Sequence, residues 1–168
     1  YQQAAPLELY RAPEKLIYRF INRQLVFAYD DRQRLTLNSC NVVIPHIPGL
    51  DMRYIMAILN SRVAQYIYEK RYNAVKVLRS HIENIPVPVA DEETQRRIIS
   101  KAEELMAEEL ITESSVNSEM QTYKTGKDHL QRYRLYEEID DIVRKLYSVT
   151  DEEYEFIKQS LSGDKYML

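Results

Sequence analysis

The sequence predicts an α+β fold, with a small mixed or antiparallel β core and helices in residues 1–90 and a helical region in residues 91–168. Short runs of β-branched and aromatic residues, each ended by polar or turn residues, are confined to the first region. Charged stretches with apolar residues at helical spacing fill the second region. We expect the two regions to pack as one structural unit.

The expected strands are residues 16–18, 25–29, 41–44 and 74–78. The stretch AYDDRQRLTL predicts a hairpin that turns at residues 30–31. Its return arm is expected to contain Leu35 and Leu37. The run of residues 41–44, which Pro45 ends, is a candidate for a buried strand. In the stretch AVKVL, Val75 and Val77 are expected on one face.

Helices are expected over residues 52–59, 62–71, 92–110, 127–147 and 151–161. Asp51 and Asp91 are predicted to cap the first and third of these helices. Thr150 and Glu153 fit a capping box before the last helix, and Gly163 is expected to end it. The third helix carries a narrow apolar stripe of Ile98, Ala102, Leu105 and Leu110. Such a stripe is typical of packing against a single neighbour.

Charge divides the sequence at the same point as the predicted fold. Residues 1–90 carry twelve Lys and Arg against seven Asp and Glu, and residues 91–168 carry eleven against nineteen. Nine of the twelve are Arg, the side chain suited to bidentate contacts with phosphate or guanine. The asymmetry indicates a basic working region and an acidic scaffold. The alternative is that both regions are ordinary solvated surfaces.

Motifs for catalysis and for metal binding are absent from the sequence. The three histidines lack zinc-site spacing, and the three glycines form neither a dinucleotide fingerprint nor a phosphate loop. Cys40 is the single cysteine, which excludes a disulfide framework and favours a reducing cytoplasm. No apolar run is long enough to span a bilayer. We therefore expect a cytoplasmic, non-catalytic fragment without membrane contact, metal or cofactor, and the first residue, Tyr1, suggests that it was cut from a longer protein.

One stretch, YIYEKRYNAVKVLRSH, interleaves aromatic and basic side chains. Its members are Tyr66, Tyr68, Tyr72, Lys70, Arg71, Lys76 and Arg79. Lysine and arginine anchor phosphates, and tyrosine and asparagine supply hydrogen bonds and stacking contacts. The stretch therefore predicts a nucleic-acid contact. The alternative is that Tyr66 and Ile67 belong to the core while the cations are only solvated.

Several stretches resemble one known family. MAILNSRVAQYIYEKR resembles the helix of the TaqI-like C-terminal specificity domain, where a Leu-Asn-Ser step precedes an aromatic-rich helix. VKVLRSHIENIPVPV is similar to that family's basic strand and Ile-Pro-x-Pro segment. DEETQRRIISKAEEL resembles the helix that follows this segment, also in the specificity subunits of type I restriction systems.

The tail, EIDDIVRKLYSVTDEEYEFI, is similar to the C-terminal end of large adenine-specific methyltransferases and of fused restriction-modification enzymes. Ser148 stands where that tail often has a glycine, which hints at a different cap geometry. The resemblance spans roughly residues 13–160. It implies a target recognition domain that binds a specific double-stranded DNA sequence. A methyltransferase domain of the same polypeptide, sometimes joined to a nuclease, would use S-adenosylmethionine elsewhere.

The residues expected to contact DNA are Arg32 and Arg34 in the hairpin, Lys70, Arg71, Tyr72 and Asn73 after the second helix, and Lys76 and Arg79 on the last strand. Arg19 and Arg23 are further candidates, although either could instead form a structural ion pair. The resemblance assigns none of them to a particular base. The competing function is a helical protein–protein or dimerisation module that does not bind DNA, and the oligomeric state stays open.

Overall fold

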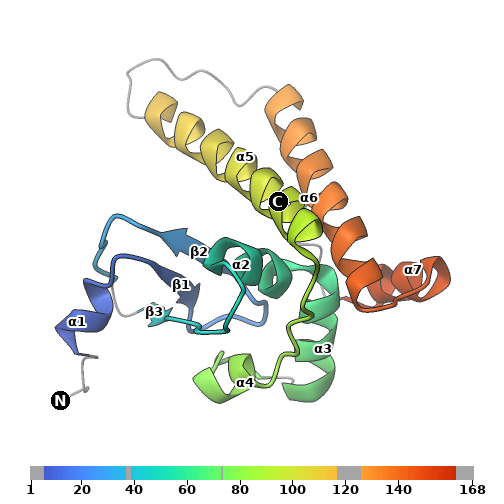
Figure 1. Cartoon of the computed structure of the whole chain (residues 1–168), viewed down its shortest axis with the longest axis horizontal. Coiled ribbons are helices and arrows are strands. Elements are labelled where there is room, and N and C mark those ends of the chain that lie inside the picture. The colour runs from blue at the N-terminus through green and yellow to red at the C-terminus, as the bar shows by residue number, and fades with distance from the viewer. Residues whose placement is uncertain (1–5, 37–38, 73, 117–125, 162–168) are drawn as a thin grey trace.

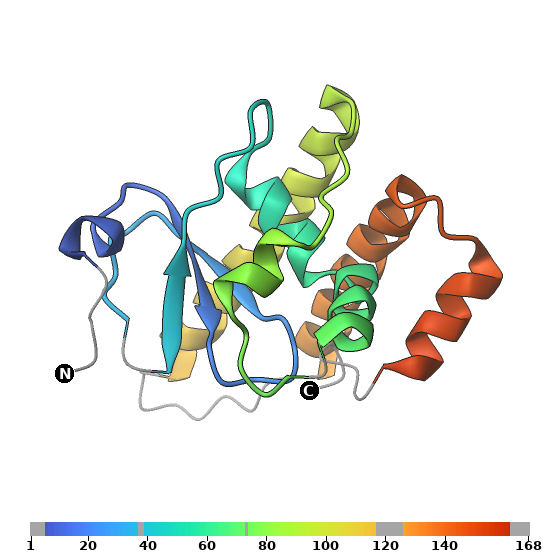
Figure 2. The same cartoon turned by 90° about the horizontal axis from the view of Figure 1, so that it is seen from below.

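The computed structural model describes residues 6–36, 39–72, 74–116 and 126–161. Its elements are α1 (Leu7–Tyr10), β1 (Lys15–Arg19), β2 (Phe27–Asp30), β3 (Cys40–Val43), α2 (Met52–Asn60), α3 (Arg62–Tyr72), α4 (Arg79–Glu83), α5 (Glu92–Val116), α6 (Gly126–Leu146) and α7 (Asp151–Ser160). The sheet and α1 lie at one end of the molecule and α7 lies at the other (Figures 1 and 2). The predicted α+β fold with a helical C-terminal region is confirmed.

The sheet has three antiparallel strands in the order β2-β1-β3. Leu16 of the central strand pairs with Tyr29 on one side and with Val43 on the other. Leu16 and Tyr18 are buried in a core shared with α2, which also contacts α5. β3 is only half-buried, because it is an edge strand with a neighbour on one side. The prediction that it is a buried strand is therefore wrong.

The prediction of a hairpin turning at residues 30–31 is also wrong. β2 instead pairs with β1, the strand that precedes it, so the hairpin connection is the segment before β2 and not the segment after it. The Asp30 carboxylate accepts hydrogen bonds from the backbone N–H of Arg34 at 2.9 Å and of Arg32 at 3.4 Å. These bonds turn the chain away from the sheet, and Leu35 is exposed. Leu37 lies outside the described residues.

The strand predicted over residues 74–78 is reduced to one isolated bridge, between Ile21 and Lys76. Val77 is buried but Val75 is 55% exposed, so the two do not share a face. The chain pairs only briefly because it turns at once into α4. Arg79 therefore begins a helix and does not lie on a strand.

Two side-chain amides cover the outer edge of β2. Asn60 Nδ2 donates to the carbonyl oxygen of Phe27 at 2.8 Å, and the Phe27 N–H donates to Asn60 Oδ1 at 3.0 Å. The Leu25 N–H donates to Gln65 Oε1 at 2.7 Å, and Gln65 Nε2 donates to the Arg23 carbonyl at 3.3 Å. Unpaired edge groups that are buried would be costly. The Leu-Asn-Ser step thus has a structural role in the sheet.

The next two side chains connect α3 to its neighbours. Ser61 Oγ donates to the Ile58 carbonyl and accepts from the Ala64 N–H, which joins α2 to α3. The guanidinium of Arg62 lies 2.9 Å from Asp140, and the Asp140 carboxylate also accepts the Arg62 backbone N–H at 3.1 Å. Arg62 and Asp140 are each 2% exposed. A buried charge is stable only with such a partner.

The same guanidinium reaches two further groups on the C-terminal helices. Nη2 of Arg62 lies 2.7 Å from Glu137 of α6, and Nη1 donates to the Tyr154 hydroxyl of α7 at 3.1 Å. Burial raises the pKa of Tyr154, so its hydroxyl remains protonated. One side chain from the first region therefore binds two helices of the second, α6 and α7.

The segment between α4 and α5, residues 84–90, is held through alternate carbonyl oxygens. Arg71 donates to the Asn84 carbonyl at 3.0 Å, and Tyr147 donates to the Pro86 carbonyl at 2.5 Å. Tyr54 donates to the Pro88 carbonyl at 2.7 Å, and Gln95 donates to the Ala90 carbonyl at 2.9 Å. Burial raises the pKa of Tyr54 and of Tyr147, which keeps both hydroxyls protonated as donors. We call residues 84–90 the proline strap.

α5 and α6 lie side by side in both views (Figures 1 and 2). Asp91 caps α5 as predicted, because its carboxylate accepts the Thr94 N–H at 2.9 Å. The predicted stripe is buried at Ile98, Ala102 and Leu105, whereas the side chain of Leu110 is outside the described residues. Since this stripe packs within the chain, its described part is not available to a partner.

The turn from α6 to α7 keeps the geometry of a glycine-ended helix. The N–H of Val149 donates to the Arg144 carbonyl at 2.9 Å and the N–H of Ser148 donates to the Lys145 carbonyl at 3.0 Å, a Schellman pattern. Ser148 has a φ of 57°, in the left-handed region that favours glycine. The different cap geometry expected from serine is therefore not found.

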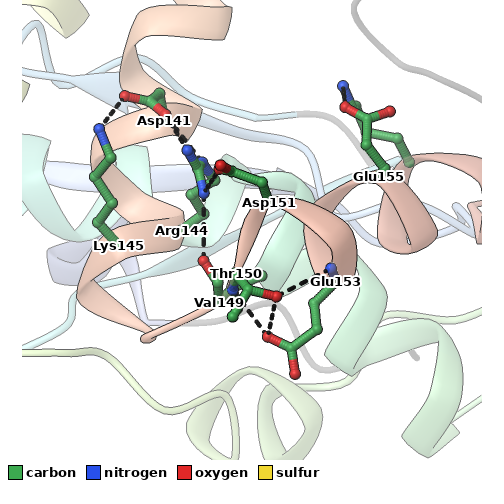
Figure 3. Close-up of polar contacts among 9 residues, drawn as sticks. Asp141, Arg144, Lys145, Val149, Thr150, Asp151, Glu153 and Glu155 are labelled. Atoms are coloured by element: carbon green, nitrogen blue, oxygen red, sulfur yellow. Dashed lines mark hydrogen bonds and ion pairs between the residues drawn. The ribbon is translucent and has the colours of Figure 1, made fainter.

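Charged side chains fix this turn from both sides (Figure 3). Arg144 lies 2.8 Å from Asp141 and 2.7 Å from Asp151, so it joins α6 to the first turn of α7. Thr150 and Glu153 form the predicted capping box. The predicted glycine stop, Gly163, is outside the described residues.

Removing the carboxylate that faces Arg62 should be strongly destabilising. We expect Asp140→Asn to lower the free energy of unfolding by about 3 kcal/mol, because a buried guanidinium loses its charged partner. Urea denaturation at neutral pH measures the change. Glu138→Gln is the matched control, since Glu138 pairs with Lys101 at an exposed position worth about 0–1 kcal/mol. Equal effects of the two changes would contradict a special role for Asp140.

Glycine at the α6–α7 turn should stabilise the protein. We expect Ser148→Gly to raise the free energy of unfolding by about 0.5–1 kcal/mol, because glycine adopts a positive φ without strain. Thermal denaturation gives the change. Ser160→Gly, inside the last turn of α7, should instead lower stability. A loss of stability in Ser148→Gly would show that the positive φ is not strained.

Candidate nucleic-acid interface

The connection between β1 and β2 is fixed against the segment that follows α3. The N–H of Asn22 donates to the Val75 carbonyl at 3.0 Å, and the N–H of Val77 donates to the Phe20 carbonyl at 2.8 Å. Lys76 lies between these bonds, with Nζ 5.8 Å from the centre of the Phe20 ring. Residues 20–26, which we call the β1–β2 turn, therefore stand beside Lys76.

The last turn of α3 supplies two further cations. Lys70 lies over the ring of Tyr66, 5.3 Å from its centre, and stays exposed. Arg71 Nη1 donates to the Asn84 carbonyl of the proline strap at 3.0 Å. A guanidinium has five N–H donors, so this bond leaves Arg71 able to bind another group.

Three predicted contacts after α3 have other surroundings. The ring of Tyr72 stacks on His81 at 4.1 Å between centroids, so Tyr72 is half-buried against α4. Arg79 pairs with Glu83 at 2.6 Å on the exposed face of α4. Asn73 lies outside the described residues. Tyr72 therefore packs against α4. The exposed ion pair between Arg79 and Glu83 is weak, so Arg79 can leave it to bind another anion.

Four exposed cations, at the β1–β2 turn, on its bridge and at the end of α3, define what we call the cationic patch: Arg19, Arg23, Lys76 and Lys70. In the part of the chain that the structure describes, none of the four has a carboxylate within ion-pair distance. Arg19 ends β1, and the Arg23 carbonyl is bound by Gln65 of α3. The patch therefore combines unneutralised charge with a fixed backbone.

Arg32 and Arg34 lie at the opposite end of the β1–β2 pair. The register Lys15 with Asp30 and Tyr18 with Phe27 places the β1–β2 turn at one end and the chain after Asp30 at the other. Both arginines are exposed, at 60% and 51%. The structure therefore separates Arg32 and Arg34 from the other described residues among the predicted contacts.

Asp30 organises the segment that carries these two arginines. Its carboxylate pairs with Lys15, and both side chains are almost fully buried. Burial alone would raise the pKa of Asp30, but hydrogen bonds from Lys15 and from the backbone of Arg34 and Arg32 hold it below its usual value. Gln33 has a φ of 53°, so the chain reverses between the two arginines.

A cleft of about 450 Å³ opens beside this segment, between β2, α2, α5 and α6. Arg32, Arg34 and Arg53 contribute to its lining, and Phe27 and Met56 supply apolar surface. Arg53 is already bound to Asp51 at 2.7 Å and pairs with Glu103. The two outer arginines are thus the more available cations at this end.

Two residues at the cationic patch had no place among the predicted contacts. Phe20 supplies the ring beneath Lys76, and Ile21 projects from the β1–β2 turn with 61% of its surface exposed. The signal in the sequence is Arg-Phe-Ile-Asn-Arg, in which two arginines flank an apolar pair. Only the pairing of this turn with Lys76 shows that Ile21 lies among three cations.

The described ranges contain neither a metal-binding cluster nor a membrane-spanning helix. No group of three or more His, Cys, Asp or Glu side chains there could hold a metal ion. Within the same ranges, the helices are too short or too polar to cross a membrane. The two basic groups and the cleft are candidate binding features.

Unpaired cations presented on a rigid turn and a helix end are typical of a domain that binds nucleic acid. The model of the TaqI-like C-terminal specificity domain matches residues 1–87. The chain belongs to this family. It is a DNA-recognition specificity domain of the kind found in restriction-modification enzymes, and such domains are generally non-catalytic.

The match ends within the proline strap, so it covers the sheet, α2, α3 and α4. The resemblance described above for residues 91–168 lies outside it and remains an expectation. No curated protein matches the chain.

The ion pair beneath Arg32 and Arg34 should make stability depend on pH. The lowered pKa of Asp30 stabilises the fold above the unfolded value of about 3.9, and this contribution is lost as pH falls through the folded pKa. We therefore expect Asp30→Asn to be destabilising at pH 7 and to converge with the wild type as pH falls below the folded pKa of Asp30. Urea denaturation across this range measures it. The exposed Asp31→Asn is the control and should show little difference; a constant gap for Asp30→Asn would contradict the assignment.

Proposed function

We propose that this chain holds a double-stranded DNA sequence in register for a methyltransferase domain of the same polypeptide. The cationic patch carries the proposal, because its four exposed cations lack carboxylate partners in the described chain and lie on a fixed turn, on its bridge and on a helix end. Such cations would neutralise phosphates and release the counterions condensed on the duplex. A backbone already held in place loses little conformational entropy when DNA binds.

The cations of the proposed contact are held by different neighbouring groups. The aromatic rings of Tyr66 and Phe20 lie beneath the ammonium groups of Lys70 and Lys76, and both lysines are exposed. Arg71 and Arg79 extend the patch toward α4. Arg79 pairs with Glu83 at the surface, and it can exchange this weak ion pair for a phosphate contact. Together with Arg19 and Arg23, these four cations form the principal proposed contact with the phosphate backbone.

Arg32 and Arg34 form the second proposed contact. β1 has five residues and is about 16 Å long at about 3.3 Å per residue. That length is similar to the width of the major groove, about 12 Å. We infer that the two basic groups, at opposite ends of the β1–β2 pair, bind phosphates on either side of one groove, with residues between them near the base edges.

The parent enzyme is proposed from the resemblance of the tail to adenine-specific methyltransferases. Its catalytic domain would bind S-adenosylmethionine, and a nuclease domain would complete a fused restriction-modification enzyme. The target adenine would leave the base stack to reach that domain. The contribution of this chain would be to select the sequence and fix the duplex, without chemistry of its own.

Salt dependence tests the phosphate contact. We expect affinity for a duplex, measured by fluorescence anisotropy, to fall steeply between low and physiological salt. Lys76→Ala should weaken binding to duplexes of any sequence and lower the slope of log affinity against log salt by about 1. Arg96→Ala removes an exposed cation from the outer face of α5 and should change neither quantity. Affinity that does not respond to salt would overturn the proposal.

A further inference from the structure

The side chain of Ile21 has an unusual position at the cationic patch. A single exposed apolar residue is common and needs no explanation by itself. Ile21, however, is 61% exposed at the centre of a charged surface, two residues from Arg19 and two from Arg23, and directly opposite Lys76 in the bridge. Its neighbours make it a candidate for recognition.

The backbone around Ile21 is held on both sides. Backbone hydrogen bonds tie Asn22 and Phe20 to the segment beside them, at 3.0 and 2.8 Å. Gln65 binds the chain again at Arg23 and Leu25. An isoleucine side chain on such a backbone is positioned before binding and loses little entropy on contact.

The positive charge of the cationic patch determines which kind of partner it can bind. Arg19, Arg23 and Lys76 have no carboxylate partner in the described chain, so the complementary surface must be anionic. A second copy of this chain, related by two-fold symmetry, would set these cations against themselves. Double-stranded DNA supplies phosphates around an accessible groove and therefore fits the ring of cations.

The groove also supplies an apolar group at its centre. An aliphatic side chain has no donor or acceptor, so it cannot satisfy the polar base edges of the major groove. The 5-methyl group of thymine is the apolar feature of those edges. Resting on the proposed DNA binding, we propose that Ile21 is a specificity-determining residue that contacts a thymine methyl while Arg19, Arg23 and Lys76 hold the flanking phosphates.

Sequence selection from a randomised pool tests this assignment without knowing the recognised sequence. The full chain is incubated with duplexes carrying a randomised segment, and the bound fraction is sequenced. The selection is repeated with a pool in which deoxyuridine replaces thymidine, which removes the methyl group alone. The same two pools are bound to Ile21→Ala and to Val75→Ala, a matched change at a 55% exposed apolar residue.

For the wild type, we expect a preference for A·T at one or more positions that falls when uracil replaces thymine. In Ile21→Ala, the ratio of affinities for A·T over other base pairs should fall about fourfold. This factor corresponds to about 0.8 kcal/mol for one methyl group withdrawn from water. The response of this variant to uracil should disappear, while its affinity for unselected DNA stays the same. Val75→Ala should behave as the wild type.

The outcomes separate this inference from the proposed function. If the wild type selects a sequence but Ile21→Ala keeps every preference, or Val75→Ala loses the same one, the role of Ile21 is overturned and DNA binding stands. If the wild type selects no sequence, the specificity assignment is overturned. If the wild type binds no duplex, both proposals fail together, and an acidic protein surface becomes the occupant to test.

Discussion

The fold depends on three consecutive side chains at the junction of α2 and α3. Asn60 binds both backbone groups of Phe27 on the open edge of β2, Ser61 joins the two helices, and Arg62 binds α6 and α7. A sheet of three short strands is marginal alone. Here Asn60, at the end of α2, completes the open edge of the sheet. The junction of α2 and α3 is in turn held by the C-terminal helices through Arg62. Loss of any of these contacts would leave a buried polar group without a partner.

This junction also explains how the opposite charges of the two regions are arranged. Arg53 and Arg62 belong to the basic region, yet both pair with carboxylates of α5 or α6. The acidic helices therefore neutralise the cations that face them. Among the described residues, the four cations of the cationic patch, at the β1–β2 turn, its bridge and the end of α3, are left without carboxylates. Other exposed cations without an ion pair in this part of the chain, such as Arg11 and Arg97, are scattered. A net charge counted along the sequence hides this division between structural and available cations.

Periodicity and capping residues predicted the five longer helices, because these signals are local: Asp51, Asp91 and Thr150 all cap as expected. The short helices α1 and α4 were not predicted. Strand pairing is not local, so the sequence around residues 30–31 suggested a forward hairpin where β2 actually pairs backward. The site was predicted in part. Residue type indicated the cations, but only the fold shows that Tyr72 packs on His81 and that Arg32 and Arg34 stand apart from the rest.

The proline strap has a consequence for how such proteins diverge. Its four hydrogen bonds all end on backbone carbonyls, at every second residue, so they do not depend on which side chains the strap carries. Two donors come from the region that reads DNA and two from the helical region. A recombination event that exchanged one reading region for another could therefore join the halves within this segment. The new protein would need only an extended strap and a donor at each of the four positions.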